Sequence, residues 1–268
     1  MLRSMYSGVS GLRGHQTMMD VVGNNIANVN TTGFKSSSTV FQDVLSQTVQ
    51  GAGAPGVELG GTNPAQVGLG SRVGAITQNF GQGAVQVTNR AEDLAIEGDG
   101  FFVVQLGAET LYTRAGNLSF DQTGTLVTPG GGRVLGVDGA PVVRPETNAA
   151  GEGLLSYTIS PDGTLVGVFA SGNEDLAQIA LVTFTNPGGL EKTGNSLYRA
   201  TVNSGAPELG APGEDGYGTL ASGMLEMSNV DLAQEFTNLI VAQRGFQANS
   251  RTITTSDEML QELVNLKR

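Results

Sequence analysis

The sequence predicts a mainly β protein with α-helical termini. The N- and C-terminal helices pair as a coiled coil, and the chain between them forms a Gly-rich connector and one antiparallel β domain. Three observations lead to this class. All nine prolines lie between Pro55 and Pro212, so both ends lack the strongest helix breaker. Apolar residues recur every three or four positions at both ends and every second position in the middle. Forty glycines, 6% aromatic residues and no Trp favour turn-rich β structure.

The first 30 residues contain the first predicted helix. Its apolar residues fall on alternating steps of three and four, the spacing of a heptad seam, and Gln16 and Gly23 occupy the two positions where an apolar residue is missing. The apolar members are Leu2, Met5, Val9, Leu12, Met19 and Ile26. We expect Leu12, Met19 and Ile26 to lie on the seam that faces a partner helix.

Residues 20–38 are unusually rich in Asn and Gly for the end of a helix. Both residue types are weak helix formers, so we expect them to serve a purpose other than helix stability. Residues 50–71, rich in Gly, Ala and Pro, follow and indicate a long loop or linker.

The middle of the chain predicts short strands separated by turns. Two segments, "DQTGTLV" at 121–127 and "SPDGTLV" at 160–166, repeat an Asp-containing turn that leads into a strand. We interpret them as hairpins in which Asp121 and Asp162 hydrogen bond their own turn backbone. A calcium loop is a weaker interpretation, because the regular ladder of acidic ligands is missing.

The C-terminal segment predicts a helix from Val230 to about Leu266, roughly 55 Å long at 1.5 Å per residue. Ser228 and Asp231 have capping-box spacing at its start. Its apolar stripe is Leu232, Phe236, Leu239, Phe246, Ile253, Leu260 and Val264. We assign Phe236, Leu239, Phe246, Ile253 and Leu260 to the assembly seam.

Each terminal segment could instead be an ordinary amphipathic helix lying on the domain core. The stripes are narrow and partly polar, so each helix needs a narrow partner. The nearest such partner is the other terminus, followed by other copies of the chain.

Residues with catalytic or metal-binding chemistry are scarce. Cysteine is absent and His15 is the only histidine, so no thiolate site and no site with two imidazoles can form. "PGGGRVLG" at 129–136 lacks the Lys-Ser/Thr ending of a phosphate loop and indicates a hairpin. Glu214 and Asp215 are adjacent acids in a Gly-rich loop, where such acids are usually solvated rather than paired for catalysis. We therefore expect no catalytic residue, no cofactor and no metal.

Charge and hydropathy exclude two further classes. The net charge of -11 disfavours nucleic acid, and the chain has no cluster of Lys and Arg. No apolar run reaches the length of a membrane span, and the start has no signal-peptide pattern. We expect a chain that does not insert into a membrane and that either stays in the cytoplasm or is exported without cleavage.

Both ends resemble the signatures of the bacterial flagellar rod and hook family. "YSGVSGLRGHQTMMDVVGNNIANVNTTGFKSS" is similar to the N-terminal signature, and "ASGMLEMSNVDLAQEFTNLIVAQRGFQANSRTITTSDEMLQELVNLKR" is similar to the C-terminal one. "ITQNFGQGAVQVTNRAEDLAIEGDGFFVV" looks like the inner β domain of the family. The resemblance thus covers the whole chain.

The resemblance implies a non-enzymatic subunit of a helical tube. Residues 1–30 and 225–268 would form the inner tube domain, 31–74 the connector and 75–224 the outer β domain. The signature turn, where the chain would leave the inner helix, consists of Asn24, Asn25, Asn28, Gly33, Phe34 and Lys35.

The resemblance also implies partners and an export route. The partners are other copies of the chain, the neighbouring axial proteins (distal rod, hook cap and hook–filament junction) and the flagellar type III export apparatus. Phe41 and Leu45 resemble the export-gate motif of early substrates; an apolar i, i+4 pair on a short helix is the alternative.

Within the family, residues 162–201 look most like the hook protein, so the favoured function is a subunit of the curved, extracellular hook that transmits torque from rod to filament. The alternative is the distal rod, a straight, envelope-spanning drive shaft. Many hook proteins carry an extra outer domain, and residues 144–155 leave no room for one. A secreted carbohydrate binder or hydrolase is the interpretation from a different class.

Overall fold

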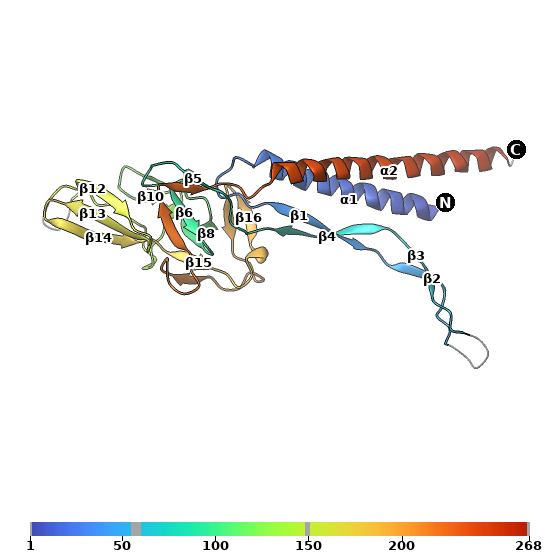
Figure 1. The fold of residues 1–268 in the computed structure, drawn as a ribbon, viewed down its shortest axis with the longest axis horizontal. Helices are drawn as coiled ribbons and strands as arrows, with labels where there is room; N and C mark the ends of the chain where they lie inside the picture. Colours follow the sequence, from blue (N-terminus) through green and yellow to red (C-terminus); the bar gives the residue numbers. More distant parts are fainter. Residues whose placement is uncertain (1, 55–59, 148–150, 267–268) are drawn as a thin grey trace. The chain divides into compact units, whose positions relative to one another are not determined.

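The computed structural model describes residues 2–54, 60–147 and 151–266 (Figure 1). The chain forms two compact units, each assembled from separate segments. The helix unit consists of Met1–Ala27, Ser37–Gln78 and Asp231–Arg268, and the β unit consists of Asn28–Ser36 and Asn79–Val230. The central residues of the predicted loop 50–71 and of segment 144–155 lie outside the described residues.

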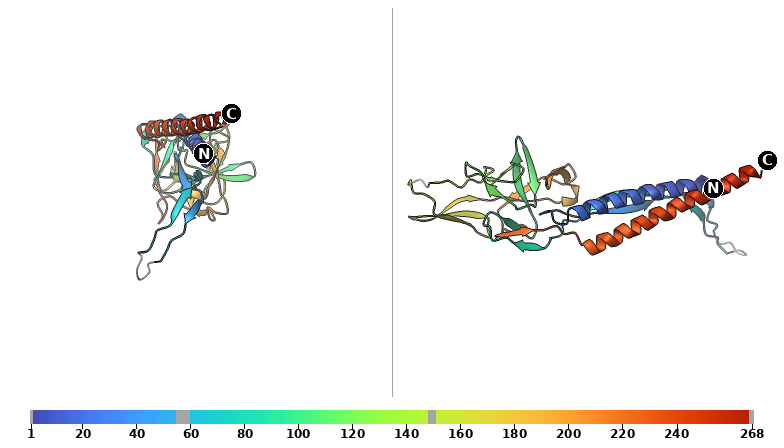
Figure 2. Two further views of the ribbon diagram at one scale, coloured as in Figure 1. Left: turned by 90° about the vertical axis from the view of Figure 1, so that its right-hand side faces the viewer. Right: turned by 90° about the horizontal axis from the view of Figure 1, so that it is seen from above.

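Two helices, α1 (Leu2–Ala27) and α2 (Leu232–Asn265), lie side by side and antiparallel in the helix unit (Figures 1 and 2). This arrangement confirms helical termini that pack on each other. The contacts follow one antiparallel register: Ser4 lies by Ser256, Gly8 by Ile253, Gly11 by Asn249, His15 by Gly245 and Asn25 by Glu235. The last turns of α2 therefore extend past the start of α1.

Glycines allow the two helices to approach closely. A Cβ atom added at Gly11 would lie 2.6 Å from Asn249 Nδ2, and one added at Gly245 would lie 2.5 Å from the His15 ring. A side chain at either position would displace the side chain of Asn249 or His15, so glycine allows the close packing seen here.

The predicted N-terminal seam is therefore rotated relative to the observed one. Gln16 and Gly23, expected to face the partner helix, are exposed, and no atom lies within 4 Å of a Cβ built at Gly23. Gly8 and Val22 are buried instead, and Gly8 and Gly11 lie against Ile253 and Asn249 of α2. The apolar periodicity pointed to the wrong face because small residues, which carry little hydropathy signal, form the contact.

A two-stranded ribbon completes the helix unit. Strand β1 (Ser37–Asp43) pairs with β4 (Ser71–Gln78), and β2 (Ser46–Gln50) pairs with β3 (Ala65–Gly68), all antiparallel. The ribbon contacts α1, where the Ser71 N–H donates to Ser10 Oγ at 3.3 Å. The predicted loop 50–71 thus includes a strand, β3, and its role as a connector stays a prediction.

The β unit is built on a nine-stranded sheet. Seven strands follow one another in the order β16-β17-β8-β7-β11-β10-β9, while β15 pairs with β7 and β18. Their bounds are β7 (Phe101–Leu106), β8 (Glu109–Thr113), β9 (Ser119–Phe120), β10 (Leu126–Val127), β11 (Arg133–Val134), β15 (Leu181–Thr183), β16 (Glu191–Gly194), β17 (Leu197–Arg199) and β18 (Glu208–Gly210).

Three smaller sheets and a short 3-10 helix accompany it. The sheets are β12-β13-β14, β6-β19 and β5-β20. Their bounds are β5 (Val85–Val87), β6 (Leu94–Glu97), β12 (Ser156–Ile159), β13 (Thr164–Phe169), β14 (Gly172–Gln178), β19 (Thr219–Ser222) and β20 (Met224–Glu226), and the 3-10 helix is Pro187–Gly189. The fold class predicted from the sequence, mainly β with antiparallel sheets, is confirmed.

The core of the β unit consists of two large apolar clusters and a small third one formed by Val104, Leu111 and Leu197. One large cluster centres on Phe102, Leu118 and Leu165, and the other on Phe101, Tyr112 and Phe184. Phe101 and Phe102 are consecutive residues of β7, so their side chains point to opposite faces of the strand, and each face contributes to one of these clusters.

Candidate assembly surface and chain junction

The predicted seam residues fall into two groups. Leu12, Met19 and Ile26 of α1 and Leu239, Ile253 and Leu260 of α2 are half-buried within the helix unit. Phe236 and Phe246 are 51% and 37% exposed. Six of the eight are therefore partly covered within the helix unit, and the two aromatic rings stay accessible. The assignment of all eight to a seam between copies stays a prediction.

The outer surface of α2 carries many accessible apolar side chains. They are Leu232, Phe236, Ile240, Val241, Phe246, Met259, Leu263, Val264 and Leu266, each at least 37% exposed. They are spread around the helix rather than along one face, and accessible apolar side chains in this number are typical of a helix that contacts other proteins.

Asp231 is the N-cap of α2, and its carboxylate accepts hydrogen bonds from the backbone N–H of Ala233 and of Gln234. Ser228, predicted as the other cap residue, lies before the helix, and its Oγ accepts from Val230 N–H at 3.3 Å. The predicted capping box, which begins at Ser228, was therefore one turn too early, because Asp231 supplies the oxygen that the first helical N–H groups need.

The first signature residues belong to the helix rather than to a turn. Asn24 and Asn25 lie in the last turns of α1, and Asn25 is 1% exposed. Its side chain accepts from Ser37 N–H at 3.0 Å and donates to Ser37 C=O at 2.8 Å and to Glu235 at 3.1 Å. Asn25 thus ties α1 to the start of β1 and to α2.

The turn itself begins after α1. Asn28 accepts a hydrogen bond from Thr31 Oγ1 at 3.0 Å, and the Thr31 N–H donates to its carbonyl. Of the six signature residues, only Gly33 adopts the left-handed conformation, with φ of +65°. A Cβ at Gly33 would lie 2.5 Å from Ala115 N, so this glycine is needed for conformation and for space.

Lys35, from the N-terminal signature, and Glu226, from the C-terminal one, form a fully buried ion pair inside the β unit. Both side chains are 0% exposed, and Lys35 Nζ lies 2.6 Å from Glu226 Oε1. Lys35 also donates to Gly81 C=O at 2.9 Å, and Gly83 N–H donates to Glu226 Oε1 at 2.8 Å. The pair joins positions 191 residues apart in the sequence.

Arg114 makes this a three-charge cluster. Its Nε lies 3.8 Å from Glu226 Oε2, and its side chain is 3% exposed. Burial lowers the pKa of Lys35 and that of Arg114 below their ordinary values, and the carboxylate of Glu226 acts in the opposite direction on both. Without Glu226, two cations would be buried side by side, so the carboxylate is required for this packing.

Asn229 and Lys192 extend the junction. Asn229 accepts from Ser36 N–H at 2.8 Å and donates to the carbonyls of Asn79 at 2.8 Å and Gly81 at 3.0 Å. Lys192 Nζ lies 4.8 Å from the centre of the Phe34 ring and donates to Lys35 C=O at 3.2 Å. The segments around residues 33–36, 79–83 and 226–229 are therefore bound to one another. We call the contacts of Lys35, Glu226, Arg114 and Asn229 the chain junction.

Sequence reasoning found Lys35 but missed Glu226 and Arg114. The signal was present: Glu226 lies in "MLEM", and Arg114 ends the apolar strand "TLYTR". A charge within an apolar strand indicates a buried partner.

The suggested export-gate residues lie on the ribbon. Phe41 is in β1, where its ring centre lies 5.9 Å from that of His15, and Leu45 follows the strand and is 82% exposed. The alternative of a short helix is therefore wrong. The export role stays a prediction.

The structure supports the hairpin interpretations. Asp121 Oδ1 accepts from the N–H groups of Thr123 and Thr125, each at 2.8 Å, and Asp162 Oδ1 accepts from Thr164 N–H at 3.3 Å. Residues 129–132 connect the antiparallel strands β10 and β11.

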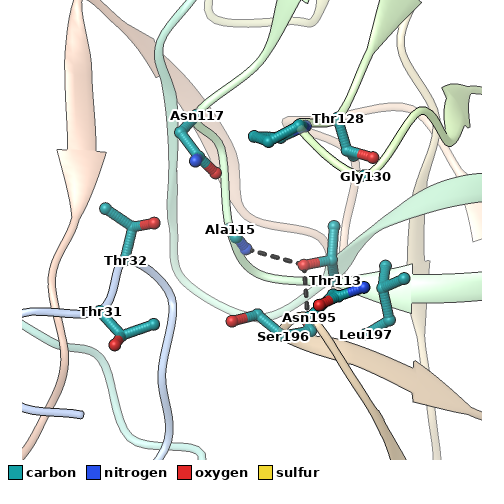
Figure 3. A pocket seen from close by; sticks show the side chains of 11 residues that line it. Thr31, Thr32, Thr113, Ala115, Asn117, Thr128, Gly130, Asn195, Ser196 and Leu197 are labelled. Atoms are coloured by element: carbon teal, nitrogen blue, oxygen red, sulfur yellow. Dashed lines mark hydrogen bonds between the residues drawn. The ribbon is translucent and has the colours of Figure 1, made fainter.

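A pocket of about 330 Å³ in the β unit is lined by uncharged groups (Figure 3). Thr113 Oγ1 accepts from Ala115 N–H at 3.0 Å and donates to Ser196 C=O at 2.8 Å, so this hydroxyl holds two loops together. Among the described residues, no three His, Cys, Asp or Glu side chains are grouped to hold a metal ion. Neither α1 nor α2 is long and apolar enough to cross a membrane.

Antiparallel terminal helices with accessible apolar side chains, together with a separate antiparallel β unit, define the class of a structural subunit. Family comparisons agree. Residues 5–35 match "Flagella basal body rod protein", residues 95–167 match "Flagellar hook protein FlgE/F/G D1 domain", and residues 221–266 match "Flagellar basal body rod FlgEFG protein C-terminal".

Individual relatives match over their full length. The chain is 54% identical to the flagellar basal-body rod protein FlgG of Bacillus subtilis and 41% identical to that of Borreliella burgdorferi, with all of each chain covered. It is 32% identical to the flagellar hook protein FlgE of B. burgdorferi, over an alignment of 441 positions that also covers both chains. The chain belongs to the flagellar rod and hook family of axial structural proteins.

Proposed function

We propose that the chain is the distal rod subunit, which assembles into the straight shaft that transmits torque across the cell envelope. The observation that carries this proposal is the end-to-end identity of 54% with a FlgG rod protein over 270 positions. The sequence alone favoured the hook, and the comparisons favour the rod.

Chain length supports the rod over the hook. The alignments with FlgG proteins span 266 to 276 positions, close to the 268 residues of this chain, whereas the alignment with the hook protein of B. burgdorferi spans 441. A hook protein of that length carries a large insertion that this chain lacks.

The mechanical role follows from the contacts. In this proposal, the accessible apolar side chains of α2 pack against neighbouring copies and form the tube wall. The chain junction then carries load between the segments that enter and leave the β unit, because a buried ion pair and its hydrogen bonds resist separation. The partners are other copies, adjacent axial proteins and the export apparatus, which the chain passes without cleavage.

Deletion of the gene, followed by electron microscopy of isolated basal bodies, tests the proposal. The distal rod function predicts truncated rods without hooks, and the intact gene supplied on a plasmid restores full-length rods. Complete rods that lack only the hook would overturn the rod proposal in favour of the hook. Normal hook-bearing basal bodies would overturn both.

A further inference from the structure

The face of α2 opposite α1 carries a row of four charged residues divided by sign. Arg244 and Arg251 lie in its middle, and Glu258 and Glu262 lie in its last turns; all four are exposed. Arg244, Arg251 and Glu258 are seven residues apart, and Glu262 is one turn beyond, so all four share one face. We call this row the charge stripe.

The position of the charge stripe follows from the helix pair. Ala242, Asn249 and Ser256 of α2 are buried or half-buried against α1, and the first three stripe residues each follow one of them by two positions. Two positions correspond to about 200° around a helix. The stripe therefore points away from α1, where nothing within the helix pair can neutralise it.

The stripe residues have no ion-pair partner within the described part of the chain. The salt bridges there involve other residues: Lys35–Glu226, Arg90–Glu92, Arg114–Glu226 and Arg199–Glu109. Between the two arginines, the surface forms a hollow of about 360 Å³, lined also by Gln247 and Ala248. The small side chain of Ala248 leaves space there for a carboxylate from another molecule.

From these observations we infer that the charge stripe is a contact between copies, in which the arginine half of one α2 binds the glutamate half of a neighbouring, parallel α2. The two halves carry two charges each and are centred roughly 19 Å apart along the helix. Parallel helices staggered by that distance bring opposite charges level, whereas unstaggered helices place like charges side by side. The stripe thus specifies the stagger between neighbours.

This inference rests on the proposed assembly into a rod. A second copy is favoured as the occupant because the same stripe supplies both signs in equal number. Interfacial charges of this kind chiefly determine register and exclude wrong pairings.

Reversal of both charges in one half of the charge stripe tests this inference. Arg244→Glu/Arg251→Glu makes the stripe wholly acidic, and Glu258→Lys/Glu262→Lys makes it wholly basic. Each variant alone should give no rods in basal bodies seen by electron microscopy, since every contact between copies is then repulsive. Cells that produce both variants should form rods again, because acidic and basic stripes can alternate. A chain that carries all four reversals should also assemble.

A matched control separates this contact from a general effect of charge. Asp257→Lys changes the net charge of the chain by the same amount as Glu258→Lys, and it lies in the same turn but outside the stripe. This variant should leave rod formation intact. The inference is overturned if either half-reversed variant assembles alone, or if the two together do not. Complete rods in cells that lack the gene would overturn the proposed function instead. The deletion strain therefore separates a failure of the proposed function from a failure of the charge stripe.

Discussion

At the scale of single residues, the Lys35–Glu226 pair is the feature with the largest energetic consequence. Removal of one partner leaves a charge buried without compensation, which costs about 3–5 kcal/mol. We predict a loss of that size for Glu226→Gln, measured as the free energy of unfolding in denaturant. Replacement of both residues, as Lys35→Met/Glu226→Leu, should recover only part of it, because Arg114 stays buried and loses the carboxylate beside it.

The control for this prediction is the surface pair Arg199–Glu109, whose side chains are 46% and 60% exposed. Glu109→Gln should change stability by less than about 1 kcal/mol, because solvent screens exposed pairs. Similar losses for Glu226→Gln and Glu109→Gln would show that the buried pair has no special role.

The buried Tyr198 and the half-buried Tyr157 predict a loss of stability in alkali. Burial raises the pKa of Tyr198 to about 12, and burial together with a hydrogen bond to Glu92 raises that of Tyr157 to about 12. The pKa of an unfolded tyrosine is about 10. Because the folded pKa is the higher one, this contribution to stability is complete below pH 10 and is lost as the pH rises towards 12.

Absorbance of tyrosinate at 295 nm checks this prediction. We expect a step near pH 12 that becomes smaller by one tyrosine in Tyr157→Phe. Complete ionisation of every tyrosine near pH 10 in the folded protein would contradict it.

At the scale of elements, the absence of cysteine allows a clean test of the antiparallel helix register. The hydroxyl oxygens of Ser4 and Ser256 are 3.5 Å apart, so cysteines at both positions should form an intrachain disulfide on mild oxidation. Ser4→Cys/Ser250→Cys is the matched control, since Ser250 is exposed and lies more than a turn away from Ser256. Mobility on a non-reducing gel distinguishes the two, and equal cross-linking of both variants would refute the register.

At the scale of the whole molecule, Phe246 and Ile253 should affect assembly in different ways. Phe246 is 37% exposed, so Phe246→Asp should block assembly between copies while the β unit stays folded. Ile253 contacts Gly8 within the subunit, so Ile253→Asp should also weaken the helix pair. Gln243→Asp, at an exposed position of α2, is the control. Sedimentation measures the amount of assembled material, and circular dichroism of the unassembled subunit measures its helix and β content. Assembly by Phe246→Asp would show that Phe246 does not belong to the seam.

The sequence allowed prediction of the architecture but not of its closest contacts. Helical ends and a β middle followed from the confinement of proline and from the change in apolar period. The helix register did not, because Gly8, Gly11 and Gly245 create it and glycine contributes nothing to an apolar stripe. The pairing of Lys35 with Glu226 spans the chain and has no local pattern, although each residue lies in a recognisable signature.

Because the two units are interleaved along the chain, neither can be excised as one continuous piece. The chain passes between them four times, next to residues 27, 36, 78 and 230. A domain fused to either end would extend a helix of the pair, where packing against neighbours is expected. A new domain can avoid both helix ends by insertion between two strands of the β unit, for example between β11 and β12. The hook protein of B. burgdorferi, which aligns over 441 positions and matches this chain at both ends, is consistent with an internal insertion rather than an added terminal domain.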